Sequence, residues 1–152
     1  MVEINLEELL NEYLKDNRLM QLATVADGYP WLCNLYFVHD DDNNIYWTSA
    51  KIRRHSKELK ADSRVAATIL RDEDKKQALQ ITGDAFEVPL KDVEYVDKLY
   101  ASKFGDKSRA AEVLANDPDG RAFWVLKPKL IEFWDEVNFP DAHKQTIVNI
   151  GN

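Results

Sequence analysis

Residues 46–59 have the sequence YWTSAKIRRHSKEL, in which a strand-like start changes into a helical pattern. The aromatic and β-branched residues at 45–49 predict a short strand. Residues 51–61 follow a helical period. One face of this helix would carry the side chains that can pack on a sheet, namely Ile52, His55, Ser56 and Leu59. The basic side chains would then lie on the opposite face.

The helical part begins with cations, although the first turn of a helix favours acids. Lys51, Arg53 and Arg54 fall in this turn, where the helix dipole disfavours each exposed cation by about 0.3–1 kcal/mol. A bound phosphate would remove the conflict, because backbone N–H groups and cations would converge on one anion. Thr48 and Ser49 could cap the helix or donate hydrogen bonds to that phosphate. The alternative is a solvated charged face, and the pattern does not name the anion.

On both sides of this stretch, short strand patterns outnumber helical ones. Strands are predicted at 19–25, 31–38, 45–49, 65–70, 77–88, 122–126 and 130–134. Helices are predicted at 3–15, 51–61, 92–104 and 108–114. Residues 138–152 show no usable periodicity, and the chain has no repeat or linker. We therefore expect one domain over residues 1–152, a mainly β protein with helices (α+β) built as a small antiparallel barrel.

The charge distribution points to a small anionic ligand. The net charge of -7 argues against a general nucleic-acid or anionic-membrane binder. Residues 51–60 nevertheless contain five Lys or Arg residues and one acid, a local excess of four positive charges. The N-terminus lacks the features of a signal peptide, and Cys33 is the only cysteine. We expect a cytoplasmic protein without an intrachain disulfide.

Several other kinds of site are not supported by the sequence. Residues 40–44 imitate the start of a calcium loop, but the sixth and twelfth loop positions are Ile45 and Lys51. The three histidines, His39, His55 and His143, show no metal-ligand spacing, so no metal site is expected. The chain also lacks a glycine-rich nucleotide loop and a nucleophile-elbow pattern.

Further patterns accompany the opening stretch in a fixed order. They are LMQLATV at 19–25, GYPW at 28–31, RHxKxLxxDxRVA at 54–66, QxxG at 80–83 and FWVLxPxxIEFW at 123–134. In this order they resemble the pyridoxamine 5'-phosphate oxidase-like superfamily of FMN-binding split barrels, over roughly residues 15–135. The resemblance implies a homodimer of six-stranded split β-barrels with flanking helices, with FMN in clefts at the subunit interface.

The resemblance also implies which residues contact the cofactor. Thr48 and Ser49 would lie near the ribityl-phosphate or the ring edge of the flavin. The phosphate would be held by Arg54 and Lys57, with Lys51, Arg53 or His55 as further candidates.

Three more residues are implied nearer to the flavin ring. The strand at 34–36, which begins with Asn34, would pass alongside the ring with its backbone groups. Gln80 would approach the flavin from the same subunit or from the partner subunit, and Trp47 would either flank the isoalloxazine or lie in the core.

Two departures from the family pattern shape the expected function. Residues 135–143 contain no arginine, unlike the substrate motif of vitamin B6 oxidases, so we do not predict pyridoxamine 5'-phosphate oxidase activity. Residues 31–34 read WLCN where flavin-binding members often have an arginine. We predict an FMN-dependent oxidoreductase that transfers hydride between a reduced nicotinamide or small organic molecule and FMN. The alternatives are a non-catalytic module that binds flavin, heme or a deazaflavin on the same fold, and a cofactor-free dimer.

Overall fold

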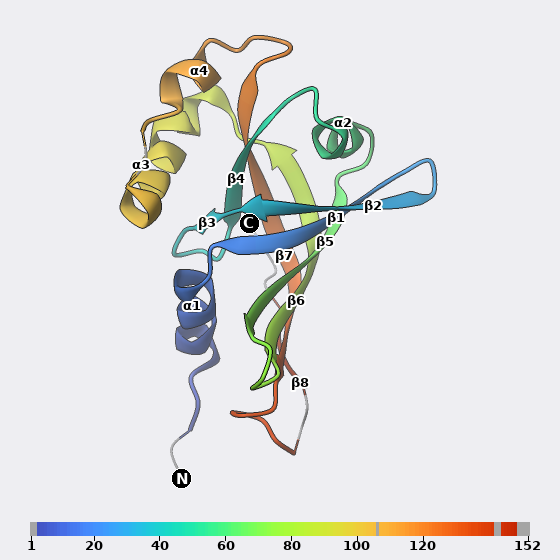
Figure 1. The fold of residues 1–152 in the computed structure, drawn as a ribbon, viewed down its shortest axis with the longest axis vertical. Helices are drawn as coiled ribbons and strands as arrows, with labels where there is room; N and C mark the ends of the chain where they lie inside the picture. The colour runs from blue at the N-terminus through green and yellow to red at the C-terminus, as the bar shows by residue number, and fades with distance from the viewer. Residues whose placement is uncertain (1–2, 106, 142–143, 149–152) are drawn as a thin grey trace.

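The computed structural model describes residues 3–105, 107–141 and 144–148. Its strands form a curled antiparallel sheet flanked by helices (Figure 1). The strands are β1 (Leu19–Ala26), β2 (Tyr29–Tyr36), β3 (Val38–His39), β4 (Ile45–Ala50), β5 (Arg64–Asp72), β6 (Gln77–Glu87), β7 (Arg121–Asp135) and β8 (Lys144–Val148). The helices are α1 (Leu6–Asp16), α2 (Arg54–Ala61), η1 (Leu90–Asp92), α3 (Val93–Phe104) and α4 (Ala110–Leu114).

The strand order brings distant parts of the chain together. It is β2-β1-β5-β6-β7-β4-β3, with β8 also paired to β7. The curled sheet encloses a core that contains the fully buried side chains of Trp47, Phe133 and Leu22 and the nearly buried Trp124. The predicted α+β split-barrel fold is confirmed, in the form of a curled half-barrel with flanking helices. Within the described residues, no helix has the length and apolar character needed to cross a membrane.

Strand β7 is continuous, whereas the sequence predicted two strands separated at 127–129. It pairs with β4 only as far as Leu126 and with β8 only from Leu130 onward. Pro128 lies in the gap between the segments of β7 that pair with β4 and with β8. On this edge of β7, opposite β6, the N–H that proline lacks is therefore not needed for a hydrogen bond to a neighbouring strand. The prediction of two strands was therefore wrong, because proline interrupts a strand only where a neighbour needs its N–H.

Helix α1 begins at Leu6 and not at residue 3, because Asn5 caps it. The Asn5 side chain accepts hydrogen bonds from the backbone N–H groups of Glu7 and Glu8 at 3.0 and 3.1 Å. Buried side chains of the helix, among them Tyr13 and Leu14, pack against one end of the main core.

Helix α2 also begins later than predicted, at Arg54. Residues 51–53 form a turn, in which the N–H of Lys51 bonds to Gly120 and the N–H of Arg53 bonds to Ala50. Ile52 therefore lies outside the helix and is 53% exposed, which contradicts the predicted packing face at that position. The other members of that face, His55, Ser56 and Leu59, are buried as predicted.

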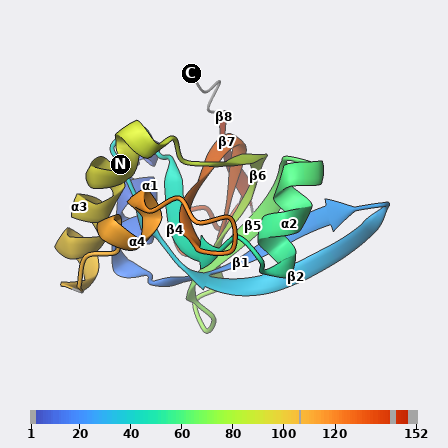
Figure 2. The ribbon, with the colours of Figure 1, turned by 90° about the horizontal axis from the view of Figure 1, so that it is seen from above.

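Helices α3 and α4 form a second layer over the outer face of β4 and β7. Figure 2 shows them on one side of β4 and α2 on the other. Beneath them lies a smaller core that contains Val96, Val113 and Phe123. Gly105 ends α3 in a left-handed conformation with a φ of 63°.

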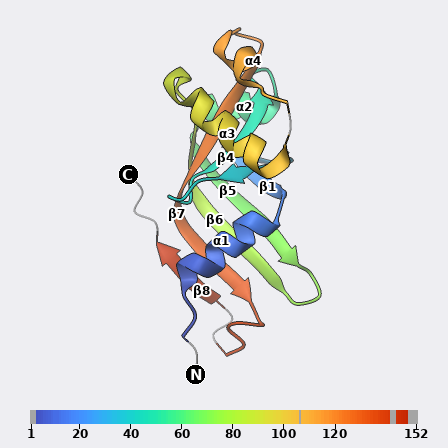
Figure 3. The ribbon, with the colours of Figure 1, turned by 90° about the vertical axis from the view of Figure 1, so that its left-hand side faces the viewer.

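Strand β2 lies at the edge of the sheet and is exposed on both faces. Trp31 is 40%, Leu32 61% and Tyr36 64% exposed, and the β1–β2 hairpin protrudes beyond α2 (Figure 1). At the other end of the chain, β8 pairs with the second half of β7 (Figure 3). The sequence did not predict β8; residues 142–143 and 149–152 of the tail lie outside the described residues.

Candidate functional site

Arg54, expected to hold a phosphate, contacts protein groups on both sides of its guanidinium. Its Nε lies 3.1 Å from Oε1 of Glu58, and its guanidinium lies 4.1 Å from the centre of the Trp31 ring. The buried Glu58 carboxylate also accepts a hydrogen bond from Thr24 at 2.9 Å. Arg54 therefore joins α2 to the β1–β2 hairpin.

Ser49 and His55 face each other in the protein interior. Their Oγ and Nε2 atoms are 2.8 Å apart, and both residues are buried. Burial lowers the pKa of His55, and the nearby Arg53 lowers it further while Glu58 opposes the shift. A neutral His55 at pH 7 is a hydrogen-bond partner of Ser49, and its place among the candidates for the phosphate stays a prediction.

Of the remaining cations near the start of α2, Lys51 has a hydrogen-bond partner, whereas Arg53 and Lys57 have none among the described residues. Lys51 is buried and donates a 2.9 Å hydrogen bond to the side chain of Asn116. Within the described residues, the exposed side chains of Arg53 and Lys57 make no ion pair or hydrogen bond. Arg53 occupies the N-cap of α2, where no side chain caps the helix. The start of α2 thus keeps free backbone donors and two unpaired cations.

Trp47 and Gln80, the last two residues expected near the flavin ring, lie in the core and on the surface of β6. Trp47 is fully buried opposite Trp124 in the main core, which is the second of the two roles considered for it. Gln80 is exposed on β6, in register with Thr68 and Glu132 on the neighbouring strands. Neither residue lines the cavity described next.

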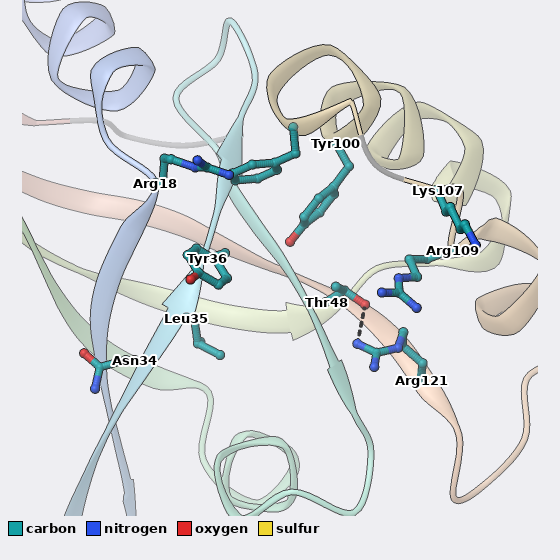
Figure 4. Close-up of a pocket in the computed structure, with 10 residues that line it drawn as sticks. Arg18, Asn34, Leu35, Tyr36, Thr48, Tyr100, Lys107, Arg109 and Arg121 are labelled. Carbon is teal, nitrogen blue, oxygen red and sulfur yellow. Dashed lines mark hydrogen bonds between the residues drawn. The ribbon is translucent and has the colours of Figure 1, made fainter.

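A cavity of about 440 Å³ lies between strands β2 and β4 and the α3–α4 layer (Figure 4). Of the ten residues expected at the cofactor site, Asn34 and Thr48 line it. The other lining residues are Leu35, Tyr36, Tyr100 and Phe104, together with four cations, Arg18, Lys107, Arg109 and Arg121.

The sequence did not indicate these four cations as site residues. They come from the start of β1, the α3–α4 connection and the start of β7, so no local charge count detects them. The register of β4 against β7 places Arg121 two positions from the partner of Thr48, and its Nη1 donates to the Thr48 Oγ1 at 3.4 Å. The Thr48 hydroxyl in turn donates to the carbonyl of Ala122 at 3.2 Å.

One wall of the cavity is a row of aromatic rings. Tyr100 stacks on Phe123 with ring centres 5.7 Å apart, and Phe104 lies between Tyr100 and Tyr36 at 5.8 and 6.2 Å. The Tyr100 hydroxyl is shielded from solvent, and within the described part of the chain its proton has no acceptor. Burial raises the pKa of Tyr100 more than the Thr48 backbone and the Arg121 charge, which act on its oxygen, lower it, so this hydroxyl stays protonated and can donate.

The cavity carries an excess of positive charge. A single acid, Glu112, lies between two of the arginines, 3.5 Å from Arg109 and 3.4 Å from Arg121. Arg18 lies over the Phe104 ring at 4.9 Å and makes no ion pair within the described residues. Burial, together with the Arg18 charge, lowers the pKa of the neighbouring Lys103 to about 8. Such a site favours an anion.

Groups that could hold a metal ion are absent from the described ranges. His39 and His55 are each hydrogen-bonded to a protein side chain, and His143 lies outside the described residues. Cys33 on β2 is half-buried; burial, with a contribution from Glu58, raises its pKa to about 11, so it is a thiol at pH 7.

The curled antiparallel sheet, the helical layer over β4 and β7, and the cavity beside β2 define a protein of the split-barrel class. A family model described as pyridoxamine 5'-phosphate oxidase matches residues 6–135. The chain therefore belongs to this family, as the resemblance predicted.

Solved structures show the same fold at low sequence identity. A protein of unknown function from Agrobacterium tumefaciens is 17% identical, with a TM-score of 0.67, covering 88% of this chain and 58% of that one. A heme binding protein from Mycobacterium smegmatis is 14% identical, with a TM-score of 0.74, covering 98% and 60%. HutZ, a heme storage protein from Vibrio cholerae, is 24% identical, with a TM-score of 0.63, covering 82% and 91%. The comparison with curated protein sequences gives no significant match.

Proposed function

We propose that this protein binds FMN and acts as an FMN-dependent oxidoreductase. The observation that carries the proposal is the cavity between β2 and β4, the two strands that the family resemblance assigns to the sides of the flavin. Residues 34–36 and Thr48 line it, and they would supply backbone groups and a hydroxyl to the flavin. The flavin would provide the hydride chemistry, and the protein would provide binding and electrostatics.

The start of α2 lies on the other side of β4 from the α3–α4 layer and does not line the cavity, but its groups suit a phosphate (Figure 2). Its free backbone donors and the unpaired Arg53 and Lys57 suit a phosphate group. Arg54 can join them, because its side chain is 53% exposed and Glu58 keeps its hydrogen bond from Thr24 when the arginine turns toward the anion. Cations along the cavity would stabilise the negative charge of a reduced flavin ring.

The exposed strand β2 supports assembly as a homodimer. Large apolar side chains on both of its faces are open to solvent in one chain, and a second chain would cover them. Gln80 on the outer face of the sheet is available to a flavin held by such a partner.

A second candidate function is heme or deazaflavin binding without turnover. Two structural neighbours are named as heme-binding or heme-storage proteins, and the four cations of the cavity would also suit the carboxylates of a tetrapyrrole. The described histidines already have protein partners, so an axial ligand would have to be released from one of them.

Absorbance spectra of the purified protein, followed by titrations with FMN and with heme, test these proposals. We expect flavin absorbance, reduction of the bound flavin by NADH or NADPH, and a Kd for FMN that rises about tenfold or more in the Arg53→Ala, Lys57→Ala double variant. Lys60→Ala, at the opposite end of the same helix, is the matched control and should bind FMN as the unmodified protein does. A heme spectrum, or bound flavin that is not reduced, would favour the second candidate. A colourless protein that ignores both cofactors would contradict both.

A further inference from the structure

The distal half of the β1–β2 hairpin extends away from the sheet. Strand β1 pairs with β5 only from Gln21 to Ala23, so within the described residues the segment 24–31 has no strand partner outside the hairpin itself. The tip protrudes beyond α2 (Figure 1). A two-stranded ribbon on its own is marginally stable in water. The position of this segment therefore depends on its side-chain contacts with the rest of the chain.

Helix α2 contacts both strands of the distal hairpin through one connected network. Thr24 on β1 and Trp31 on β2 are cross-strand partners. The Thr24 hydroxyl donates to Oε2 of Glu58 at 2.9 Å, and Nε of Arg54 donates to Oε1 of the same carboxylate at 3.1 Å. The Arg54 guanidinium lies over the Trp31 ring, 4.1 Å from its centre. Arg54 and Glu58 together fix the hairpin on the helix.

Arg54 also belongs to the basic start of α2. It is the first residue of the helix and follows Arg53, whose side chain makes no ion pair or hydrogen bond within the described residues. A guanidinium has five N–H donors, and the bond to Glu58 uses one of them. The Arg54 side chain is half-exposed and free to turn, whereas Glu58 is buried and keeps its bond from Thr24.

The two positions open to Arg54 exclude each other. Its side chain reaches Glu58, one helical turn further along, and therefore runs away from the helix start. The free backbone donors of α2 lie at the helix start, in the opposite direction. An Arg54 that turns toward an anion there no longer covers the Trp31 ring. An anion and the hairpin thus compete for one side chain, and by linkage each weakens the hold of the other on it.

We propose that Arg54 couples the phosphate site at the start of α2 to the β1–β2 hairpin: a bound phosphate group draws Arg54 away from Trp31 and loosens residues 24–31. The phosphate site rests on the proposed function, whereas the coupling rests on the contacts of Arg54. The exposed strand β2 belongs to the same hairpin. The ligand therefore changes how firmly the surface that a second chain would cover is held.

Calorimetric titrations of the full chain with inorganic phosphate and with FMN test the coupling from the side of the ligand. Trp31→Leu removes the ring that Arg54 covers and should tighten phosphate binding about twofold to fivefold, because the arginine is released. Tyr29→Leu removes an exposed ring from the same strand and is the matched control. It should bind phosphate as the unmodified protein does.

Hydrogen exchange tests the coupling from the side of the hairpin. Saturating inorganic phosphate should speed the exchange of backbone amides in residues 24–31 about twofold to fivefold in the unmodified protein. Arg54→Ala without any ligand should show this faster exchange already, and added phosphate should not speed it further. This second measurement does not require the variant to bind phosphate.

Tighter phosphate binding by Trp31→Leu together with faster exchange at residues 24–31 supports the coupling. Unchanged or weaker binding by Trp31→Leu overturns it, as does exchange that phosphate leaves unchanged or slows, or the absence of phosphate binding up to millimolar concentrations. FMN binding that Trp31→Leu leaves unchanged, with unchanged exchange in phosphate, refutes the coupling and leaves the proposed function intact. Phosphate that binds and speeds the exchange in a protein that ignores FMN does the reverse.

Discussion

Asp135 has no exposed surface, yet its carboxylate is surrounded by hydrogen-bond donors. It accepts bonds from Tyr13 at 2.8 Å, from Gln77 at 3.2 Å, and from the side chain and backbone of Asn138 at 2.7 and 2.9 Å. Burial alone would raise the pKa of Asp135, but these donors outweigh it and hold the pKa below its ordinary value. The residue ties α1, β6 and the end of β7 together.

Replacing Asp135 with asparagine should destabilise the protein by about 3 kcal/mol at pH 7, because hydrogen bonds to a buried charge are lost. A carboxylate with a lowered folded-state pKa contributes stability above its unfolded pKa of about 3.9 and loses it as the pH falls through the folded value. The difference between the variant and the unmodified protein should therefore shrink below about pH 4. Urea unfolding of the variant and of the unmodified protein, at pH 7 and below about pH 4, measures this difference in stability. Asp74→Asn, on the exposed β5–β6 turn, should unfold as the parent does at both.

At the level of elements, the junction of β6 and β7 depends on one glycine. The register shifts between Thr82 and Gly83, where the backbone of β7 comes very close. A Cβ added at Gly83 would lie 2.2 Å from the carbonyl oxygen of Lys127. No side chain at this position could avoid the contact, since both atoms belong to the backbone frame.

Gly83→Ala should therefore cost about 3 kcal/mol of unfolding free energy through overpacking and displacement of β7. Thermal or urea unfolding of the variant would show the loss. The adjacent exposed Thr82→Ala changes the same strand without the clash and should cost less than about 1 kcal/mol. Equal stability of Gly83→Ala and the parent would show that β6 and β7 can move apart freely.

At the scale of the whole molecule, we predict a homodimer in which a second chain covers the exposed strand β2. Light scattering should give twice the chain mass of 17.6 kDa. Leu32→Glu places a charge on the exposed face of β2 and should give a monomer. The fold of the single chain should be nearly as stable as before, because Leu32 is 61% exposed within one chain. Leu114→Glu, on the exposed surface of α4, should remain dimeric. If the unmodified chain runs as a monomer, or if Leu32→Glu stays dimeric, β2 is not the interface.

Elements with a strong local pattern were predictable. The Asp27-Gly28 turn lies between β1 and β2, as expected from the sequence, because both residues accept a positive φ, 52° and 79° here. The boundaries that failed depend on partners far along the chain. Strand β7 is continuous across Pro128 because β4 pairs only as far as Leu126 and β8 only from Leu130, and β8 forms because β7 offers it an unpaired edge.

The α+β class, the two strands of the β1–β2 hairpin and the buried positions His55, Ser56 and Leu59 of α2 were determined by the sequence alone, because periodicity and turn chemistry act within a few residues. Only the folded chain decided which cations share a cavity. Arg18, Arg109 and Arg121 are separated by long stretches of sequence and meet only when β4 pairs with β7 and α4 folds over them. Charge acts through space, so a basic run in the sequence can be divided among separate contacts while scattered arginines converge.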